Sequence, residues 1–546
     1  MTDWRTQVQD ELDALAERNT VDGVWRRDPA TWVTPSPGGT PASKATGWLD
    51  LPGQMAGLIS ELNEFTDAVR ADGFTDVILL GMGGSSLGPL VIDRVFGTAP
   101  GYLNLHVLDS TLPGQITAIR DRVDLRRTLI LISSKSGTTM EPLTLARYFR
   151  QQLVEVGVEK PDEYFVAVTD AGSSLDALAK ERGFRHSFNA PSDVGGRFSV
   201  LSYFGLLHAA LIGLDIEKLC GPAVDMAAAC GQTAPENPGA LLGATLGALA
   251  ACGRDKVTIV TSPGLSSFGL WVEQLLAEST GKNGRGLVPV AQEPLYDLAE
   301  YAQDRNFVYV RLSGDDNSST DAHVDTLERI GQPVTRLELA DKYDIGAEFF
   351  RWEFAVAVAA TSISVYPFDQ PDVESGKELT RNLLAASEGV SQALPDSPDL
   401  KHISGVLNGV GQGDYVAILG YIPESDELDS AVTELRTAIT KSTGAATTFG
   451  YGPRYLHSTG QLHKGGPGSV IGLVLVAGND SALATPRAES GVTVGNDYGF
   501  ESLFIAQVMG DVETLHANGH RNTLGVLNKP YPEAIRSIAE SLNTTP

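Results

Sequence analysis

The sequence predicts an α/β protein built from doubly wound parallel sheets, and two observations support that prediction. From about residue 75 onward, short runs rich in β-branched residues alternate with longer runs of helical periodicity. Most of the short runs are apolar throughout, as expected for strands that helices cover on both faces. The predicted strands span residues 76–80, 103–108, 128–132, 164–169, 256–261, 307–312, 415–419 and 470–476.

Two segments rich in turn-forming residues divide the chain. Residues 231–239 read GQTAPENPG and residues 394–401 read LPDSPDLK, and neither segment shows periodicity. We therefore expect a helical N-terminal segment over 1–60, a first α/β domain over 61–230, a second over 239–393, and a C-terminal α/β part over 402–546.

Composition and charge narrow the possible partners. The 546 residues include 41 Lys and Arg against 68 Asp and Glu, a formal net charge of −27. Such a surface repels phosphate backbones, so we expect no nucleic-acid partner. The three cysteines lack metal-ligand spacing, which predicts neither a metal site nor a disulfide framework. The first residues lack an apolar signal stretch and no apolar run is long enough to cross a bilayer, so we expect a cytoplasmic enzyme without a membrane partner.

A glycine-rich loop follows the first predicted strand. Residues 81–89 read GMGGSSLGP and precede a helical pattern. Small residues such as Gly84 and Ser85 let backbone N–H groups approach an anion at a helix N-terminus. The loop lacks the dinucleotide-binding fingerprint, because Ser86 stands where that pattern has its third glycine. Taken alone, the loop fits tight packing and ligand binding equally well.

A second loop makes a phosphate site the better interpretation. The strand predicted over 128–132 is followed by SSKSGTT, and a helical run begins at Glu141. Five hydroxyl groups and one ammonium thus lie at a helix N-terminus, whereas an N-cap needs only one hydroxyl. The residues predicted to bind an anion here are Ser134, Lys135, Ser136, Thr138 and Thr139.

One carboxylate lies in an apolar pattern. Glu278 follows Trp271 by seven residues and Leu275 by three, so it shares their apolar helix face, while Glu273 points to the opposite side. Partial burial raises the pKa of a carboxyl group and suits it to general-base chemistry. A solvated glutamate at a frayed helix end is the alternative.

Two cations lie near predicted core segments. Arg197 precedes an apolar run over 198–214 that predicts a buried helix, so its guanidinium would either stabilise an oxyanion or form a buried ion pair. Pro371 is placed to open a helix, on which Lys377 shares a side with Val373. Lys377 would be held in a site or would extend to water.

Two histidines stand out in the sequence LHSTGQLHKGG. His457 and His463 are six residues apart, which is not the i, i+4 spacing of a helical zinc site. We therefore expect no metal at these residues.

Together these motifs resemble those of the glucose-6-phosphate isomerase family. The matching segments, in the family's order, are 81–89, 134–139, 195–199, Gln274 with 278–282, and 368–370 with 374–377. The stretch 457–466 is similar to the isomerase half of transaldolase–isomerase fusion proteins. The resemblance implies two sugar-isomerase (SIS) domains and the reversible conversion of glucose 6-phosphate to fructose 6-phosphate through a cis-enediol, in a homodimer and without a cofactor.

The resemblance also implies roles for individual residues. Glu278 would move the proton, Arg197 would stabilise the enediolate, and Lys377, with Gln370, would act at the sugar-ring end. The phosphate would be held by Ser85, Ser134, Ser136 and Thr139, with help from Lys135 and Gln274. A ring-opening histidine is expected between the Glu and Lys motifs, but only His323 lies there and its surroundings do not match. His457 is therefore expected in this role, with His463 as the alternative.

Two other functions stay open from the sequence. A dual isomerase would also accept mannose 6-phosphate, because sugars epimeric at C2 differ little at the phosphate anchor. A non-catalytic phosphosugar-binding regulator would need the hydroxyl loops, but it would not need Glu278, Arg197 and Lys377 together.

Overall fold

The computed structural model describes residues 3–386, 394, 400–478 and 499–543. Its first sheet has the strand order β2-β1-β3-β4-β5. The helices α1 (Trp4–Glu17), α2 (Thr20–Trp25), α3 (Leu51–Gln54) and α4 (Ile59–Ala71) precede it. All its pairs are parallel. The strands are β1 (Asp76–Gly81), β2 (Asn104–Leu108), β3 (Thr128–Ser133), β4 (Phe165–Asp170) and β5 (His186–Ala190). The helices between and after them are α5 (Leu87–Phe96), α6 (Pro113–Arg122), α7 (Met140–Glu155), α8 (Ser174–Arg182) and α9 (Tyr203–Leu211).

Helices cover both faces of this sheet. Along β1, Val77 and Leu79 belong to one hydrophobic core with residues of α4, α5 and α9. Ile78 and Leu80 belong to another core with residues of α6, α7 and α8. Alternate side chains of a strand point to opposite faces, so the strand is apolar throughout because both faces are buried. The predicted doubly wound architecture is confirmed.

Two further parallel sheets follow. The second has the order β7-β6-β8-β9 and the third β11-β10-β12-β13. Their strands are β6 (Lys256–Thr261), β7 (Val288–Ala291), β8 (Arg305–Leu312), β9 (Val334–Leu339), β10 (Tyr415–Tyr421), β11 (Ala446–Tyr451), β12 (Val470–Ala477) and β13 (Arg521–Leu527). Their helices are α10 (Ile216–Ala229), α11 (Pro238–Ala251), α12 (Phe268–Thr280), α13 (Ser318–Arg329), α14 (Ile345–Ser362), α15 (Pro371–Ala386), α16 (Leu400–Asn408), α17 (Asp426–Thr443), α18 (Gly460–Gly465), α19 (Phe500–Ala517) and α20 (Tyr531–Asn543).

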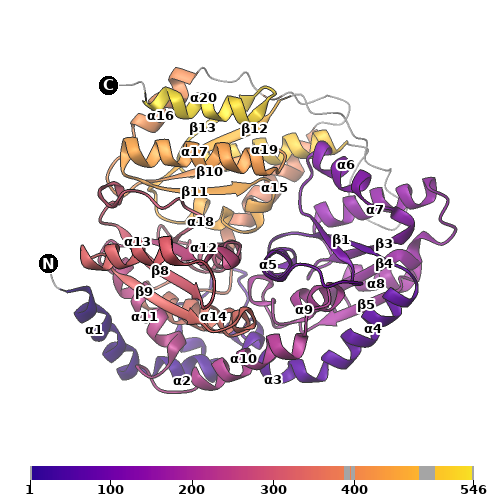
Figure 1. The fold of residues 1–546 in the computed structure, drawn as a ribbon, viewed down its shortest axis with the longest axis horizontal. Coiled ribbons are helices and arrows are strands. Elements are labelled where there is room, and N and C mark those ends of the chain that lie inside the picture. The colour runs from indigo at the N-terminus through magenta and orange to yellow at the C-terminus, as the bar shows by residue number, and fades with distance from the viewer. Residues whose placement is uncertain (1–2, 387–393, 395–399, 479–498, 544–546) are drawn as a thin grey trace.

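The three sheets share their cores. One core holds side chains from both the first and second sheets, such as Leu131 and Val308. Another joins Val288 of the second sheet to Tyr415 and Val474 of the third. Figure 1 shows the sheets around a central group of helices that includes α5, α12 and α18. Residues far apart in the chain therefore meet at α12.

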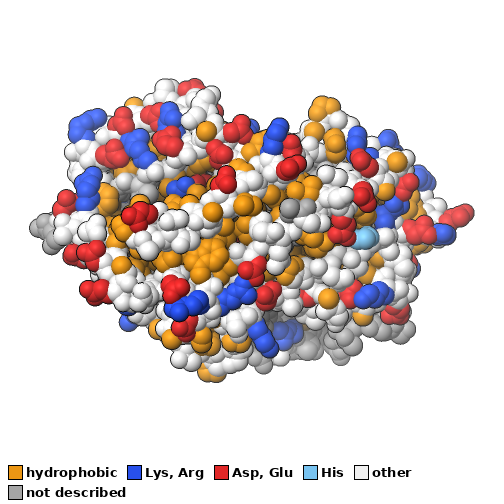
Figure 2. Space-filling view, turned by 90° about the horizontal axis from the view of Figure 1, so that it is seen from below, with side chains coloured by type: hydrophobic (Ala, Val, Ile, Leu, Met, Phe, Trp, Pro, Cys, Tyr) orange, Lys and Arg blue, Asp and Glu red, His pale blue; other side chains and the backbone are white. Residues whose placement is uncertain are grey.

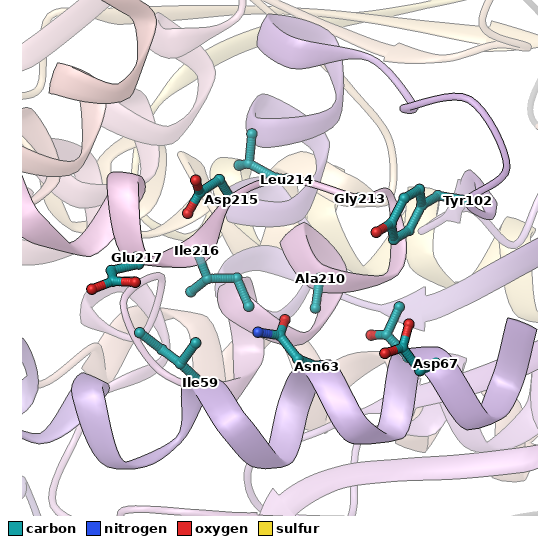
Figure 3. A pocket seen from close by; sticks show the side chains of 11 residues that line it. Ile59, Asn63, Asp67, Tyr102, Ala210, Gly213, Leu214, Asp215, Ile216 and Glu217 are labelled. Atoms are coloured by element: carbon teal, nitrogen blue, oxygen red, sulfur yellow. The ribbon is translucent and has the colours of Figure 1, made fainter.

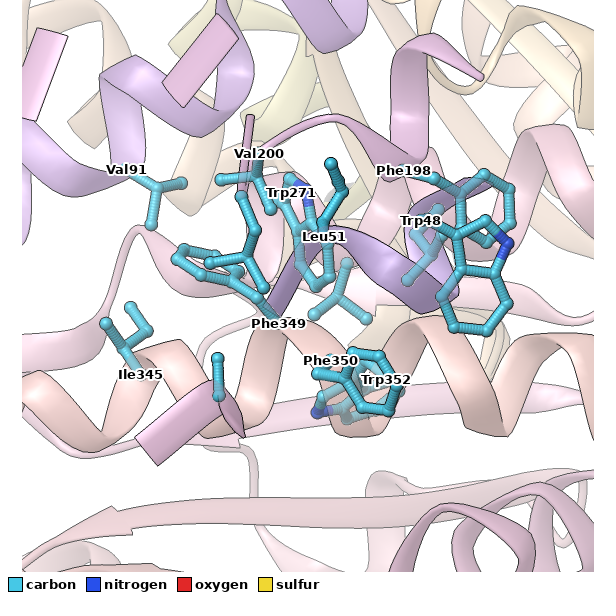
Figure 4. Close-up of a cluster of buried hydrophobic side chains, with 14 of the residues drawn as sticks. Trp48, Leu51, Val91, Phe198, Val200, Trp271, Ile345, Phe349, Phe350 and Trp352 are labelled. Carbon is cyan, nitrogen blue, oxygen red and sulfur yellow. The ribbon is translucent and has the colours of Figure 1, made fainter. Parts of the chain in front are cut away.

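An aromatic cluster lies beneath this junction (Figure 4). The rings of Trp48 and Phe198 stack with centroids 5.4 Å apart. Trp271 of α12 meets Phe349 of α14 edge-on at 4.9 Å. Close packing restricts side-chain rotation, so this cluster fixes the backbone next to Arg197 and the helix that carries Glu278.

One helix differs from its prediction. The expected helix over 198–214 is broken: a 3₁₀ turn spans Gly196–Phe198, and α9 begins only at Tyr203. The Ser202 hydroxyl accepts a hydrogen bond from the backbone N–H of Phe204, which marks the helix start. Arg197 therefore lies on a turn rather than at a helix entrance.

The surface mixes charges of both signs. Figure 2 shows the face seen from below Figure 1, where acidic and basic side chains are interspersed and apolar side chains gather near the centre. Among the described helices, none has the length and apolar character needed to cross a membrane.

Candidate functional site

Glu278 lies near the end of α12, at the junction of the three sheets. Every residue of α12 except Leu270 is buried, and Glu278 is 8% exposed. The helix ends at Gly281, as predicted. A Cβ at Gly281 would lie 2.4 Å from the Cα of Leu462, so the close approach of α18 requires glycine there. The sequence thus places a poorly hydrated carboxyl group between the second sheet and the C-terminal part.

Arg197 binds directly to this carboxylate. Its Nη1 donates to Glu278 Oε2 at 3.2 Å and to Gln370 Oε1 at 3.0 Å. Its remaining N–H groups donate to the Ser279 hydroxyl and to the backbone carbonyls of Pro367 and Asp369. Burial lowers the pKa of Arg197, and the charge of Glu278 opposes this effect. Five acceptors hold the guanidinium in one orientation, so its fixed positive charge can stabilise an oxyanion that develops beside it.

Gln274 links this pair to the glycine-rich loop. Its Nε2 donates to the backbone carbonyl of His457 at 2.9 Å and to Glu278 Oε2 at 3.3 Å. Gly83 has a φ of +55°, and a Cβ there would lie 2.3 Å from the carbonyl oxygen of His457. A Cβ at Gly84 would lie 2.0 Å from the carbonyl oxygen of Gly196. The two glycines are thus needed for close packing against neighbouring backbone, next to the buried Ser85.

The hydroxyl loop lies at the start of α7, partly open to solvent. Ser136 and Thr138 are exposed, and their hydroxyl oxygens are 2.9 Å apart. The buried Ser134 donates to the Thr139 hydroxyl at 3.1 Å. A hydroxyl hydrogen rotates about the C–O bond, so these groups can turn to donate to an incoming anion.

Lys135 in the same loop is already paired. Its Nζ lies 2.6 Å from Asp170 Oδ2 and 2.8 Å from the carbonyl oxygen of Ser192. The ammonium charge is therefore shared with a carboxylate. The hydroxyl groups and the positive end of α7 remain as the main attraction for an anion.

His457 reaches this region from the C-terminal part. It ends the 3₁₀ turn Arg454–His457, and its Nε2 lies 2.9 Å from Glu141 Oε1 in the first turn of α7. Glu141 is 6% exposed. Glu141 carries no distinguishing signal in the sequence, because an acidic residue in a first helical turn is common for electrostatic reasons alone.

The two alternative histidines lie elsewhere. His463 is buried with its Nδ1 3.0 Å from the Tyr415 hydroxyl, and burial lowers its pKa to about 3. His323 lies on α13, 3.3 Å from the Tyr301 hydroxyl, and burial lowers its pKa. Of the three candidates, the structure brings His457 to the loops.

Gln370 and Lys377 lie at the start of α15 and in its second turn. Gln370 directly precedes α15, which begins at Pro371 as predicted. Lys377 belongs to α15, and its side chain lies outside the described residues.

A buried ion pair supports the segment that holds Arg197. Lys282 Nζ lies 3.0 Å from Asp369 Oδ1 and donates to the carbonyl oxygen of Tyr366 at 2.5 Å. Burial lowers the pKa of Lys282 to about 7, and the nearby Arg197 adds to this effect. Asp369 also accepts the backbone N–H of Ser36 at 2.8 Å. Sequence reasoning did not single out Lys282, although it lies in the Glu278–Lys282 motif.

Glu273 faces away from Glu278, as predicted, and its pKa gives a stability test. Its Oε1 accepts the backbone N–H of Ala291 at 3.2 Å, and burial raises its pKa to about 7. Because the folded pKa exceeds the ordinary value, Glu273 contributes stability below about pH 4.5 that is lost as pH rises through 7. Glu273→Gln keeps an acceptor for Ala291 and has no charge to bury.

We therefore expect Glu273→Gln to increase the free energy of unfolding at pH 8 by about 2 kcal/mol relative to wild type, with little difference at pH 5. Urea unfolding at both pH values measures this. Equal stability of the two proteins at pH 8 would contradict the assigned burial of the charge.

A separate pocket has unsuitable chemistry for a phosphate (Figure 3). It has a volume of about 410 Å³ and lies among α4, α9 and α10. Asp67, Asp215 and Glu217 are among its lining residues, and these carboxylates repel an anion. The predicted site residues do not line it. Within the residues that the structure describes, no group of three His, Cys, Asp or Glu side chains is arranged to hold a metal ion.

Comparisons with known proteins point to one family. The family model described as phosphoglucose isomerase matches residues 53–287. A glucose-6-phosphate isomerase of Rubrobacter xylanophilus is 30% identical over 389 residues, which are 63% of this chain and 90% of the relative.

Solved structures share the fold. A protein of Thermus thermophilus, solved as a hypothetical protein, is 27% identical with a TM-score of 0.58, over 70% of this chain and 98% of that one. A glucose-6-phosphate isomerase of Chlamydia trachomatis has a TM-score of 0.57 at 20% identity, over 70% of this chain and 86% of that one.

Proposed function

The chain belongs to the glucose-6-phosphate isomerase family, and from that membership we propose that it interconverts glucose 6-phosphate and fructose 6-phosphate, with Glu278 as the proton-transferring base. The observation that supports this most is the 3.2 Å contact between Arg197 Nη1 and Glu278 Oε2, both buried where the three sheets meet. A carboxylate and a fixed guanidinium at one position are what an enediol reaction requires.

The proposed reaction moves one proton between adjacent carbons. The Glu278 carboxylate takes the proton from C2 of the open aldose. The electron pair of that C–H bond forms the C1–C2 double bond as the C1 carbonyl pair moves to O1, which gives the enediolate form of a cis-enediol. Arg197 stabilises the negative charge that develops on the sugar oxygens. Glu278 then returns the proton to C1, the hydroxyl proton of O2 passes to O1, and the C2 oxygen becomes the ketose carbonyl. The low exposure of Glu278 limits proton loss to water.

We assign ring opening to His457. If the Nε2–H of its ring donates to Glu141, then Nδ1 is the nitrogen that exchanges a proton with the sugar-ring oxygen. His457→Gln should lower the rate at which the enzyme exchanges the α and β anomers of glucose 6-phosphate by roughly 10²-fold, the usual contribution of one general acid. Two-dimensional exchange NMR measures this rate. Anomer exchange at the wild-type rate would refute the assignment.

We assign phosphate binding to the loop at the start of α7. Ser136 is exposed, and its described hydrogen bonds are to the hydroxyl and the backbone N–H of the nearby Thr138, so loss of its hydroxyl should leave the core unchanged. Ser136→Ala should raise KM by roughly fivefold with kcat kept, because phosphate is held alike in the ground and transition states. Steady-state kinetics decides this, and a fall in kcat at constant KM would oppose it.

The overall activity has a direct test. Glucose 6-phosphate should yield fructose 6-phosphate in a coupled assay, equally with and without a chelator. Lack of product at any enzyme concentration would reject the function. Mannose 6-phosphate in the same assay decides whether the enzyme accepts both epimers.

The remaining expectations belong to this proposal. We propose that the protein is a cytoplasmic homodimer with the domain limits given above. We also propose that Lys377 acts with Gln370 at the sugar ring and that residues 457–466 are similar to the isomerase half of transaldolase fusion proteins. Glu278, Arg197 and His457 all come from one chain, so we expect activity per subunit to be independent of protein concentration.

A further inference from the structure

Gln507 lies behind the His457–Glu141 contact. It belongs to α19 in the C-terminal part and is 3% exposed. Its Nε2 donates to Glu141 Oε1 at 2.8 Å, and the same oxygen lies 2.9 Å from His457 Nε2. Two N–H groups of the C-terminal part thus meet one carboxylate oxygen of the first domain.

Thr111 determines which way the amide of Gln507 faces. The Thr111 hydroxyl, fully buried after β2, donates to Gln507 Oε1 at 2.6 Å. A carboxylate accepts hydrogen bonds but does not donate them, so the NH₂ group of Gln507 must face Glu141 and its oxygen must face Thr111. The chain Thr111–Gln507–Glu141–His457 is therefore polarised in one direction.

The loop after β2 that carries Thr111 also contacts the 3₁₀ turn Arg454–His457. Arg454, three residues before His457, donates from Nε to Asp109 Oδ2 at 2.7 Å and from Nη2 to Glu424 at 2.9 Å. The loop that carries Asp109 and Thr111 therefore contacts both Arg454, in the turn that ends at His457, and Gln507, which binds Glu141.

We propose that Gln507 is a positioning residue for the ring-opening histidine: it fixes the Glu141 carboxylate so that His457 keeps its Nε2–H tautomer, with Nδ1 turned to the sugar. This inference rests on the role of His457 proposed above. Gln507 donates to the same carboxylate oxygen that His457 contacts, and this second donor restricts rotation of the carboxylate and so favours one ring tautomer. Thr111 acts one step further away, by holding the amide.

The test separates ring opening from isomerisation. In a Glu278→Gln background the isomerisation step is blocked, so anomer exchange of glucose 6-phosphate reports ring opening alone. Gln507→Leu removes both side-chain hydrogen bonds at similar volume. We expect it to lower the exchange rate by about tenfold, with the Kd for glucose 6-phosphate changed less than twofold. We also expect ¹⁵N spectra of labelled histidine to show a mixture of ring tautomers for His457.

Matched variants keep the test decisive. Thr111→Val should lower the anomer-exchange rate and mix the His457 tautomers, as Gln507→Leu does, but by a smaller amount. Thr111→Ser keeps the hydroxyl and should have the exchange rate and tautomer pattern of the parent protein. The control is Gln151→Leu on the exposed part of α7, which removes an amide–carboxylate bond to Glu155 and should change neither readout. If Gln507→Leu fails to fold, the Thr111 pair decides the question.

Two outcomes are distinguishable. If His457→Gln stops anomer exchange while Gln507→Leu and Thr111→Val leave the rate and the tautomer pattern unchanged, the inference is wrong and the proposed function stands. If His457→Gln in this background exchanges anomers at the parent rate, the role of His457 itself is wrong.

Discussion

Glu278→Gln should lower kcat for isomerisation by about 10⁴-fold, while KM changes by less than threefold. The amide has nearly the shape of the carboxylate and keeps an oxygen for Arg197, but it cannot take a proton from C2. Steady-state kinetics in both directions measures the loss. A variant with kcat within tenfold of wild type would show that another group carries the proton.

The same helix provides a control for this variant. Glu273→Gln makes an identical chemical change five residues earlier, in a buried side chain that faces Ala291 rather than Arg197. We expect its kcat and KM to equal those of wild type at pH 7. An equal loss in both variants would mean that a carboxylate-to-amide change disturbs α12 itself.

Arg197→Lys should have the second-largest effect, lowering kcat by about 10²–10³-fold. A lysine keeps the charge, but its single ammonium cannot reach the five acceptors that surround Arg197. The carbonyls of Pro367 and Asp369 lose charged donors, so we also expect the free energy of unfolding to fall by about 2 kcal/mol.

The kinetic and stability effects of Arg197→Lys have separate measurements. Initial rates at saturating substrate give kcat, and urea unfolding gives the stability. Arg311 is bonded to Asp321 nearer the surface, and Arg311→Lys serves as the control. It should change the free energy of unfolding by less than about 0.5 kcal/mol. If Arg197→Lys kept the wild-type kcat, a positive charge would be sufficient to stabilise the enediolate, and the planar arrangement of the guanidinium N–H groups would not be needed.

The central strands and the edge strand β2 could be predicted from sequence, whereas the other edge strands could not. β1, β3, β6, β10 and β12 are apolar because they are buried on both faces, so composition alone identifies them. The five strands that the prediction missed, β5, β7, β9, β11 and β13, all lie at sheet edges. An edge strand has one open side and tolerates polar residues, as in the sequence HSFNA of β5.

The part of the candidate site that we propose carries the proton transfer was predictable because its residues lie in short motifs. Glu278 and Arg197 each stand at the border of an apolar segment, and the structure brings them together. The histidine half was not predictable from local pattern. His457 and Glu141 are 316 residues apart in the chain, and Gln507 reaches Glu141 over a separation of 366.

Local sequence also could not separate the two histidines of one motif. His457 lies against a carboxylate, while His463 lies against Tyr415 in the core. Likewise, the sequence predicts the Lys135 ammonium as a phosphate ligand, whereas in the structure it is paired with Asp170 at 2.6 Å. Each of these outcomes depends on which distant residue lies opposite, and periodicity carries no information about that.

The most direct measurement of the central claim is deuterium incorporation during turnover. Glucose 6-phosphate converted in D₂O should give fructose 6-phosphate carrying deuterium at C1, because the proton on Glu278 exchanges with solvent in part of the turnovers. In Glu278→Gln this incorporation should disappear, while anomer exchange continues. Deuterium entering C1 at the wild-type rate in Glu278→Gln would contradict the assignment of the base.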